Sequence, residues 1–241
     1  MKEQFSRTEN LLGQGSTERL KHCRVAVFGV GGVGGFTVEA LARAGVGAID
    51  LIDSDCVSES NINRQIIALH STVGQLKVNV AEKRIRDINP DCNVTVYPVF
   101  YNDETAENFD FSKYDYIVDA IDTVSAKLNI ICRAKALNIP VISSMGTGNK
   151  LDPTAFKVSD IYKTKTCPLA RVMRSNLKKL GIKNLKVVFS EEIPKETFSS
   201  DSKTDGKRAP ASVPFVPPVA GLIIAGEVIK DLLEVKQWHE N

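Results

Sequence analysis

The stretch RVAVFGVGGVG, residues 24–34, predicts the class of fold to which this 241-residue chain belongs. Residues 24–30 form an almost continuous apolar run, which is typical of a parallel strand buried on both faces. A glycine cluster with the spacing G-x-G-x-x-G follows and leads into a stretch of helical period. Glycine lets the backbone turn tightly, and a helix N-terminus favours negative charge. This order predicts a nucleotide phosphate site at Gly29, Gly31, Gly32 and Gly34.

Apolar runs alternate with helix-period stretches in the residues that follow. Strands are expected at 48–53, 94–100, 114–120 and 140–144, and helices at 36–44, 73–88 and 125–137. Strands that alternate with helices pair in parallel through right-handed crossovers. We therefore predict an α/β fold with a doubly wound, Rossmann-like sheet that is mostly parallel and has helices on both faces.

The chain is expected to form a single domain. Its nucleotide-binding core spans residues 1–150, and residues 151–241 form a C-terminal extension in which the pattern loosens. Within the extension, we predict a basic helix over 168–180 and a final helix over 219–233 that packs back on the sheet. Residues 196–212 are rich in Ser, Thr, Asp, Gly and Lys, which predicts a mobile loop.

An acidic residue ends the second predicted strand. Asp53 follows the glycine cluster by roughly 20 residues, where a carboxylate can bind the ribose hydroxyls of a nucleotide. By itself, this combination favours NAD. An NAD(P)-dependent oxidoreductase is therefore one hypothesis that the glycine motif supports.

The residues further along favour a nucleotide with more charge. A dinucleotide pyrophosphate carries about two negative charges, whereas ATP carries about four and usually needs cations and Mg²⁺. Arg64, in the stretch NINRQ at 61–65, offers a planar fork for phosphate oxygens, and Lys77 offers a point charge. Asp122 follows a buried strand at the sheet edge where such folds bind ligands, and its carboxylate can hold Mg²⁺.

Each of these residues also has a plainer interpretation. Arg64 and Lys77 taken singly are typical solvated surface cations, and Asp122 alone is a typical N-cap for the helix after it. Asn61 and Asn63 are common turn formers. Their joint occurrence in this order favours the ATP site.

Together these residues resemble the ThiF/MoeB superfamily of enzymes that activate ubiquitin-like proteins. The resemblance covers about residues 5–150. In that superfamily the matching positions bind ATP and Mg²⁺ and form an acyl adenylate or a related adenylate. The resemblance implies ATP and Mg²⁺ as cofactors, with Mg²⁺ on Asp122. It also implies a nucleotide site that contains Asp53, Asp55, Asn61, Asn63, Arg64, Gln65, Lys77 and Asp122.

A finer resemblance is to the family of tRNA threonylcarbamoyladenosine dehydratases. Such enzymes use ATP to activate the threonyl carboxylate of a modified adenosine in tRNA and close it into a cyclic form by loss of water. This activity, with tRNA as the partner, is what the resemblance implies. It is carried by FSRTE at 5–9, NRQI at 63–66, DAID at 119–122, SSMG at 143–146, NKLDP at 149–153, CPLA at 167–170 and GLIIAGE at 221–227.

An alternative within the same superfamily is the adenylation of a ubiquitin-like sulfur-carrier protein at its C-terminus. This alternative shares every ATP-binding residue and brings a sulfur-transfer protein as partner. The C-x-x-C pairs common in carrier-activating relatives are absent from the sequence, which disfavours it. Residues 195–213 also contain no cysteine, so no thiol chemistry is assigned to them.

The resemblance also assigns a role to the N-terminus. In the superfamily, an N-terminal arginine of the second subunit reaches the γ-phosphate. Arg7 is the candidate here, with Arg19 as the second choice, and the plainer interpretation of Arg7 is an exposed terminal cation. The functional interpretation requires a homodimer.

A basic segment points to a polyanionic partner independently of any family. Residues 163–186 contain eight Lys or Arg residues and no Asp or Glu. Arg171, Arg174 and Lys178 share one helical face by their spacing and form a candidate footprint for the tRNA backbone. A solvated helix face is the alternative. Cys167 precedes Pro168 at the start of this helix and is either a thiol nucleophile or an ordinary thiol.

Composition favours a cytoplasmic protein. The net charge of +2 neither requires nor excludes a nucleic-acid partner. The five cysteines are scattered, as in a reducing compartment. The polar N-terminus predicts no signal peptide, and the apolar runs are too short for a membrane span, so no membrane partner is expected.

Overall fold

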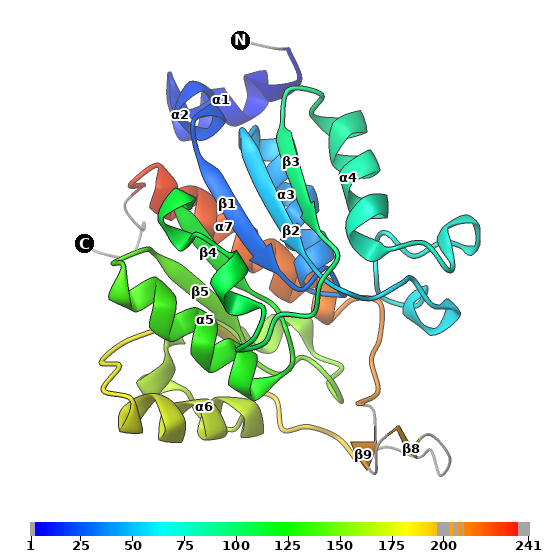
Figure 1. The fold of residues 1–241 in the computed structure, drawn as a ribbon, viewed down its shortest axis with the longest axis vertical. Helices are drawn as coiled ribbons and strands as arrows, with labels where there is room; N and C mark the ends of the chain where they lie inside the picture. The colour runs from blue at the N-terminus through cyan, green and yellow to red at the C-terminus, as the bar shows by residue number, and fades with distance from the viewer. Residues whose placement is uncertain (1–2, 197–202, 205–206, 209, 236–241) are drawn as a thin grey trace.

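A mixed sheet of seven strands forms the centre of the molecule (Figure 1). The computed structural model describes residues 3–196, 203–204, 207–208 and 210–235. The strand order is β3-β2-β1-β4-β5-β7-β6, and every pair is parallel except the edge pair β6–β7. The strands are β1 (Arg24–Phe28), β2 (Ala48–Ile52), β3 (Asn93–Tyr97), β4 (Tyr116–Asp119), β5 (Val141–Ser144), β6 (Phe156–Asp160) and β7 (Lys186–Ser190).

Helices cover both faces of this sheet, as expected for a doubly wound fold. One face carries α3 (Gly34–Ala44), α4 (Lys77–Ile88) and α7 (Pro217–Leu232). The other carries α5 (Val124–Ala136) and α6 (Pro168–Lys179). Two short helices, α1 (Ser6–Leu12) and α2 (Ser16–Lys21), lie beyond the amino ends of the strands (Figure 1).

The apolar run at residues 24–28 is explained by burial on both faces. Val25 and Val27 pack into the core beneath α3, α4 and α7, whereas Ala26 and Phe28 pack into the core beneath α5 and α6. Side chains alternate between the faces of a strand, so a strand covered on both sides needs apolar residues at every position. The prediction of a mostly parallel Rossmann-like sheet is confirmed.

The strand order reverses direction between β1 and β4. From β1 the chain builds outward through β2 and β3, and it then returns to β4 and β5 on the other side. In open α/β sheets, ligands bind outside the carboxyl ends of the strands at such a switch point. The loops after β1, β2 and β4 are therefore the ones that this topology places around a site.

Several predicted boundaries were wrong for local reasons. The helix predicted from residue 73 begins at Lys77, because Leu76 is extended and forms a β-bridge with Cys56. The strand predicted to residue 100 ends at Tyr97, directly before Pro98, which has no N–H to donate. Strands β6 and β7 were not predicted, because only tertiary pairing places residues 156–160 and 186–190 in the sheet.

The C-terminal helix packs closely on the glycine-loop helix. A Cβ atom built on Gly221 of α7 would lie 2.3 Å from the carbonyl oxygen of Val33, and Thr37 Oγ1 donates to the Gly221 carbonyl at 3.0 Å. The predicted final helix thus supports the start of α3 directly.

The predicted loop over 196–212 falls largely on residues outside the described part of the chain, namely 197–202, 205–206 and 209. The described residues between them form the short antiparallel pair β8 (Lys203–Thr204) and β9 (Lys207–Arg208). Within the described residues, no helix combines the length and the apolar character needed to cross a bilayer.

Candidate active site

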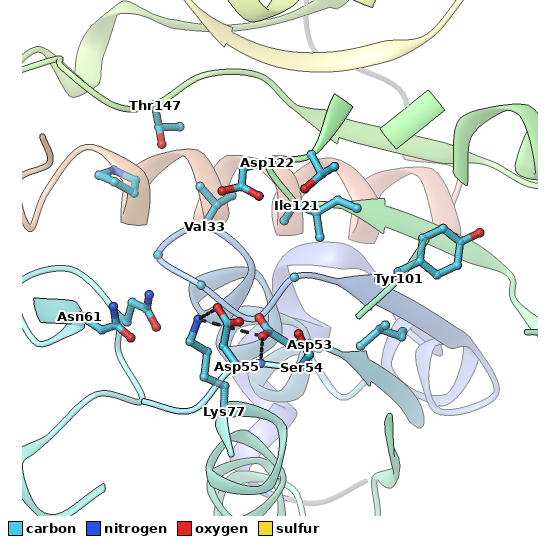
Figure 2. A pocket seen from close by; sticks show the side chains of 18 of the residues that line it. Val33, Asp53, Ser54, Asp55, Asn61, Lys77, Tyr101, Ile121, Asp122 and Thr147 are labelled. Carbon is cyan, nitrogen blue, oxygen red and sulfur yellow. Dashed lines mark hydrogen bonds and ion pairs between the residues drawn. The ribbon is translucent and has the colours of Figure 1, made fainter. Parts of the chain in front are cut away.

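A pocket of about 420 Å³ opens at the carboxyl ends of the strands, around the switch point. Its walls come from the loops after β1, β2, β3, β4 and β5, from residues 61–65 and from the segment before α7. Figure 2 shows Asp53, Asp55 and Lys77 on one side of the pocket and Asp122 and Thr147 on the other. Of the predicted residues, the pocket is lined by Gly29, Gly31, Gly32, Asp53, Asp55, Asn61, Arg64, Gln65, Lys77 and Asp122.

The glycine loop presents free amides to this pocket. The N–H groups of Gly31, Gly32 and Val33 have no acceptor among the described residues, and they lie at the N-terminus of α3. Free amides and the helix dipole make such a position favourable for phosphate.

Gly29 and Gly34 serve the packing of the loop itself. Gly29 has φ of +90°, and a Cβ there would lie 2.7 Å from the Ala120 carbonyl oxygen. A Cβ on Gly34 would lie 1.8 Å from the carbonyl oxygen of Gly29, and Gly34 does not line the pocket. These two glycines allow the turn to fold closely against the β4–α5 connection.

Asp53 links the end of β2 to the glycine loop. Its carboxylate accepts hydrogen bonds from the backbone N–H of Val30 at 2.7 Å and of Asp55 at 2.9 Å. Burial raises the pKa of Asp53, and the nearby Lys77 ammonium opposes this shift. The side chain lines the pocket, and its binding of ribose hydroxyls stays a prediction.

Lys77 is a buried cation at the start of α4. Its ammonium donates to Asp55 Oδ2 at 2.7 Å and lies 4.0 Å from Asp53 Oδ1 (Figure 2). The Lys77 side chain is 7% exposed, whereas that of Asp55 is 65% exposed. Asp55 can therefore turn away into water, which would leave the lysine charge to a phosphate.

Arg64 is held on one side and open on the other. Its Nη1 atom donates to the Ser60 carbonyl oxygen and to Asn63 Oδ1, both at 2.9 Å. Nη2 and Nε have no acceptor among the described residues. Burial lowers the pKa of Arg64, yet a guanidinium stays charged at neutral pH. The free edge can bind phosphate oxygens.

Of the residues beside Arg64, some line the pocket and one does not. The Gln65 side chain is buried, lines the pocket, and leaves its Oε1 atom without a hydrogen-bond partner among the described residues. Asn61 is buried and accepts from the Ser58 N–H at 3.1 Å, which fits the turn-forming interpretation. Asn63 does not line the pocket, and its Nδ2 donates to the carbonyl oxygen of the pocket-lining Ser212 at 3.0 Å.

Asp122 is an exposed carboxylate with no hydrogen bond or ion pair among the described residues. The N-cap of α5 is Thr123, so the N-cap interpretation of Asp122 is wrong. One turn into α5, the fully buried Lys127 donates to Asp119 Oδ1 and to the Ile121 carbonyl oxygen, both at 3.0 Å. This pair fixes the backbone that leads into Asp122.

The pocket includes residues that sequence reasoning missed. Tyr101, Thr147, Gly148, Pro210 and Ser212 line it from three separate loops. Thr147 and Gly148 lie between the motifs at 143–146 and 149–153, whereas Tyr101, Pro210 and Ser212 lie in none of the quoted motifs. These segments meet only through the topology of the sheet. The buried Lys127 was also missed, because the helix carries other polar and charged residues, such as Asn129 and Arg133, and only the structure shows which of them is buried.

A metal site built wholly from side chains is not present in the described residues, where no three of His, Cys, Asp and Glu gather. Asp122 supplies one free carboxylate in the pocket. One protein oxygen, with phosphate oxygens and water for the remainder, is the usual way in which proteins bind Mg²⁺. The donor set thus fits Mg²⁺ that arrives with a nucleotide.

Arg7 lies away from this pocket. It is exposed on α1, and α1 lies beyond the amino ends of the strands, whereas the pocket is at their carboxyl ends (Figure 1). Arg7 therefore cannot join the site of its own chain. Arg19, the second choice, is exposed on α2 at the same end.

The basic helix forms as α6, with Ala170, Met173 and Leu177 buried. Arg171 and Lys178 are exposed, and their charges make no ion pair among the described residues. Arg174 is half-buried and donates from Nη1 to the Thr164 carbonyl at 3.0 Å and to its hydroxyl. Lys186, at the end of the basic run, pairs with Glu227 and Asp231.

Cys167 occupies the N-cap position of α6 and is only 2% exposed. Its sulfur packs beside Gly146, where a Cβ atom would lie 3.7 Å away. This burial fits the ordinary-thiol interpretation of Cys167, because a nucleophile needs access to its substrate.

The fold and the pocket define a nucleotide-binding α/β protein with a glycine loop, two cations and three carboxylates at one switch point. The sequence profile of the ThiF family matches residues 5–240. The chain belongs to the ThiF family, in the branch of the tRNA threonylcarbamoyladenosine dehydratases.

A protein of Bacillus subtilis with that name is 48% identical over 244 residues, which cover 97% of this chain and 96% of that protein. The crystal structure of Escherichia coli tRNA N6-threonylcarbamoyladenosine dehydratase, TcdA, in complex with ATP aligns with a TM-score of 0.86. It is 34% identical, with 96% of this chain and 94% of that chain covered.

A relative of another kind matches only in part. The adenylyltransferase and sulfurtransferase UBA4 of Saccharomyces cerevisiae is 38% identical over 143 residues. That match covers 59% of this chain and 32% of UBA4.

Proposed function

We propose that this chain is an ATP-dependent enzyme that dehydrates N6-threonylcarbamoyladenosine in tRNA through an adenylated carboxylate. One observation carries the proposal. Free amides of the glycine loop, the free edge of Arg64 and the unpaired Asp122 line a single pocket. The likeness to dehydratases over nearly the whole chain, and to one with ATP bound, supports the choice of reaction and nucleotide.

The reaction has two steps in this proposal. A carboxylate oxygen of the substrate attacks the α-phosphorus of ATP, and pyrophosphate leaves. A nucleophile in the same modified side chain then attacks the activated carbonyl carbon, AMP leaves, and a ring closes. The sum is loss of water from the substrate with ATP converted to AMP and pyrophosphate. Catalysis of this kind consists mainly of positioning and charge neutralisation.

In this proposal, each pocket residue contacts a different part of the nucleotide. Asp53 binds the ribose, the glycine-loop amides bind phosphate at the start of α3, and Arg64 and Lys77 neutralise the polyphosphate. Asp122 holds Mg²⁺, which neutralises phosphate charge when bound. Arg64, Lys77 and Asp122 are the residues to which we assign catalysis in this chain.

A homodimer completes the site in this proposal. Arg7 is exposed beyond the amino ends of the strands, away from the pocket of its own chain. An Arg7 that reaches the γ-phosphate therefore has to come from a second subunit. The family resemblance supports this arrangement. A dimer that contributes Arg7 across its interface would make each site depend on both chains.

The tRNA is proposed to lie along α6. Arg171 and Lys178 are exposed and unpaired among the described residues, and α6 begins beside Gly146, next to the pocket-lining Thr147. A phosphate backbone on this face would bring a nucleotide of the tRNA to the pocket. A tRNA substrate also supports the cytoplasm as the place of action.

Pyrophosphate release tests the proposal. The chain is mixed with ATP, Mg²⁺ and tRNA that either carries or lacks the threonylcarbamoyl group. We expect release of pyrophosphate and AMP only with the modified tRNA, together with a loss of about 18 mass units from its nucleoside, the mass of water. Asp122→Ala is the matched inactive variant.

A second arm separates the alternatives. The same assay is run with the C-terminal tail of a ubiquitin-like sulfur carrier in place of tRNA. If pyrophosphate is released only with this tail and not with modified tRNA, the chain is a carrier-activating enzyme and the proposal is wrong. The partial likeness to UBA4 is the reason to include this arm. Hydride transfer to NAD(P)⁺ without any use of ATP would favour the oxidoreductase hypothesis instead.

A further inference from the structure

The side chain of Asn63 connects two walls of the pocket without lining the pocket itself. Its Oδ1 atom accepts from Arg64 Nη1 at 2.9 Å, and its Nδ2 atom donates to the Ser212 carbonyl oxygen at 3.0 Å. Both Arg64 and Ser212 line the pocket. One amide group therefore joins residues that are 148 positions apart in the chain, from Arg64 to Ser212.

The contact constrains the orientation of the guanidinium. Arg64 Nη1 carries two hydrogens, and its two acceptors are Asn63 Oδ1 and the Ser60 carbonyl oxygen. With Nη1 satisfied, Nη2 and Nε form the only free edge, and no acceptor among the described residues competes for it. A planar fork binds phosphate in a fixed geometry, so the direction of this edge determines what Arg64 can contact.

The Ser212 end of the connection is itself anchored. Asn149 accepts from the Ala211 N–H at 2.7 Å and donates its own N–H to the Ala211 carbonyl at 2.8 Å. A Cβ on Gly148 would lie 2.6 Å from Pro210, so the segment also packs closely on the loop after β5. Residues 210–213 are thus held from one side by Asn149 and from the other by Asn63.

We propose that Asn63 is a positioning residue that ties the Arg64 guanidinium to the segment 210–213. It acts through Arg64 and has no contact of its own with the nucleotide. This inference rests on the proposed function in one respect, namely that Arg64 binds the phosphates. The C-terminal extension thereby takes part in the nucleotide site of the core.

A double-mutant cycle on ATP affinity tests the inference. Affinity for ATP with Mg²⁺ is measured by titration calorimetry for the wild type, Asn63→Ala, Arg64→Ala and the double variant. We expect Asn63→Ala to weaken ATP binding by about three- to tenfold, the scale of one or two hydrogen bonds. In the Arg64→Ala background the same change should have an effect of less than about twofold.

Asn149→Gly tests the other end of the connection. Asn149 has φ of +60°, a conformation that glycine adopts freely, so the substitution removes the acceptor for Ala211 without backbone strain. We expect it to weaken ATP binding in the wild type and to have no effect beside Arg64→Ala. The matched control is Asn79→Ala, which removes an exposed asparagine on α4 and should leave both the affinity and the melting temperature unchanged.

The outcomes separate this inference from the proposed function. If Asn63→Ala or Asn149→Gly weakens binding equally in both backgrounds, or does not weaken it at all, the positioning role is overturned. Wild-type ATP affinity in Arg64→Ala alone would instead contradict the placement of the phosphates, which belongs to the proposed function. Melting temperatures within about 2 °C of the wild type show that a weakened variant is folded.

Discussion

The backbone N–H of Val30 donates a hydrogen bond of 2.7 Å to the carboxylate of Asp53. Asp53 directly follows β2, and Val30 is the second residue of the glycine loop after the neighbouring strand β1. The hydrogen bond therefore joins the ends of these two strands. The same carboxylate lines the pocket. The residue predicted to bind the ribose thus also holds the loop predicted to bind the phosphates.

We expect ATP with Mg²⁺ to raise the melting temperature and NAD⁺ to leave it unchanged. Arg64 and Lys77 line the pocket, and Asp122 offers a free carboxylate to Mg²⁺, a set that suits a triphosphate better than a pyrophosphate diester. A ligand at 100 times its Kd stabilises the folded state by about 2.7 kcal/mol, which a thermal-shift measurement detects easily. Equal stabilisation by NAD⁺ alone would contradict the adenylating function.

Arg64→Ala and Asp122→Ala should each lower ATP turnover by at least about 10²-fold while the fold remains intact. Loss of one charge contact in a transition state has this scale, and neither side chain belongs to the apolar cores. Pyrophosphate release measures turnover, and the melting temperature reports the fold. The control Asp87→Ala removes an exposed carboxylate on α4 and should remain active. Turnover within a few fold of wild type in both test variants would show that the assignment of these residues is wrong.

Replacing Arg171, Arg174 and Lys178 together by Ala should weaken tRNA binding and flatten its dependence on salt. Each phosphate contact contributes about 0.7–0.9 to the slope of log affinity against log salt concentration. Since Arg174 already donates to Thr164, we expect the double variant Arg171→Ala/Lys178→Ala to account for most of the change.

Binding at several salt concentrations for the wild type and both variants gives the slopes, and ATP affinity should be spared. Lys83→Ala, which removes an exposed cation from α4 on the opposite face of the sheet, is the control. Identical slopes for the wild type and the triple variant would remove this face of α6 from the proposal.

Gly221→Ala and Gly226→Ala should have opposite effects on stability although both lie in α7. The new methyl at 221 would lie 2.3 Å from the Val33 carbonyl oxygen and force α7 away from α3, with an expected cost of about 1–3 kcal/mol. The methyl at 226 meets no atom within 4 Å, so the helix should gain about 0.5–1 kcal/mol. Denaturant unfolding measures both. A Gly221→Ala variant as stable as the wild type would mean that α7 can move away from the Val33 carbonyl oxygen at little cost.

Glu39→Gln should destabilise the protein at neutral pH and have little effect in acid. Burial acts to raise the pKa of Glu39, but hydrogen bonds and charges from Arg84 and Arg43 outweigh it, so the pKa lies below its usual value of 4.5. A lowered folded-state pKa contributes stability above the unfolded-state pKa, and this contribution is lost as the pH falls through the folded-state value.

The melting temperatures of the wild type and Glu39→Gln, measured from pH 7 to pH 3, check this expectation. The difference between the two proteins should be largest at pH 7 and shrink below about pH 4.5. A difference that stays constant across this range would show that the ion pairs of Glu39 do not determine it.

Much of the nucleotide site was predictable because its parts are local in sequence. The apolar run before Gly29, the turn through Gly31 and the acid at Asp53 each follow from backbone sterics and burial over a few residues. The strand order then requires that the loops after β1, β2 and β4 meet, which brought Asp53, Lys77 and Asp122 into one pocket as expected.

The sequence by itself determined the class of fold and predicted the residues of a phosphate site, since short-range patterns encode strands, turns and helix termini. Only the tertiary structure decided which atom of each side chain is free. Asn63 binds Ser212 and Arg64 without lining the pocket, and Lys77 pairs with Asp55. Arg7 lies beyond the amino ends of the strands, away from the pocket of its own chain. The antiparallel pairing of β6 with β7 likewise became known only from the tertiary structure. These facts depend on contacts between distant segments, whose geometry is set by packing and not by the spacing of residues along the chain.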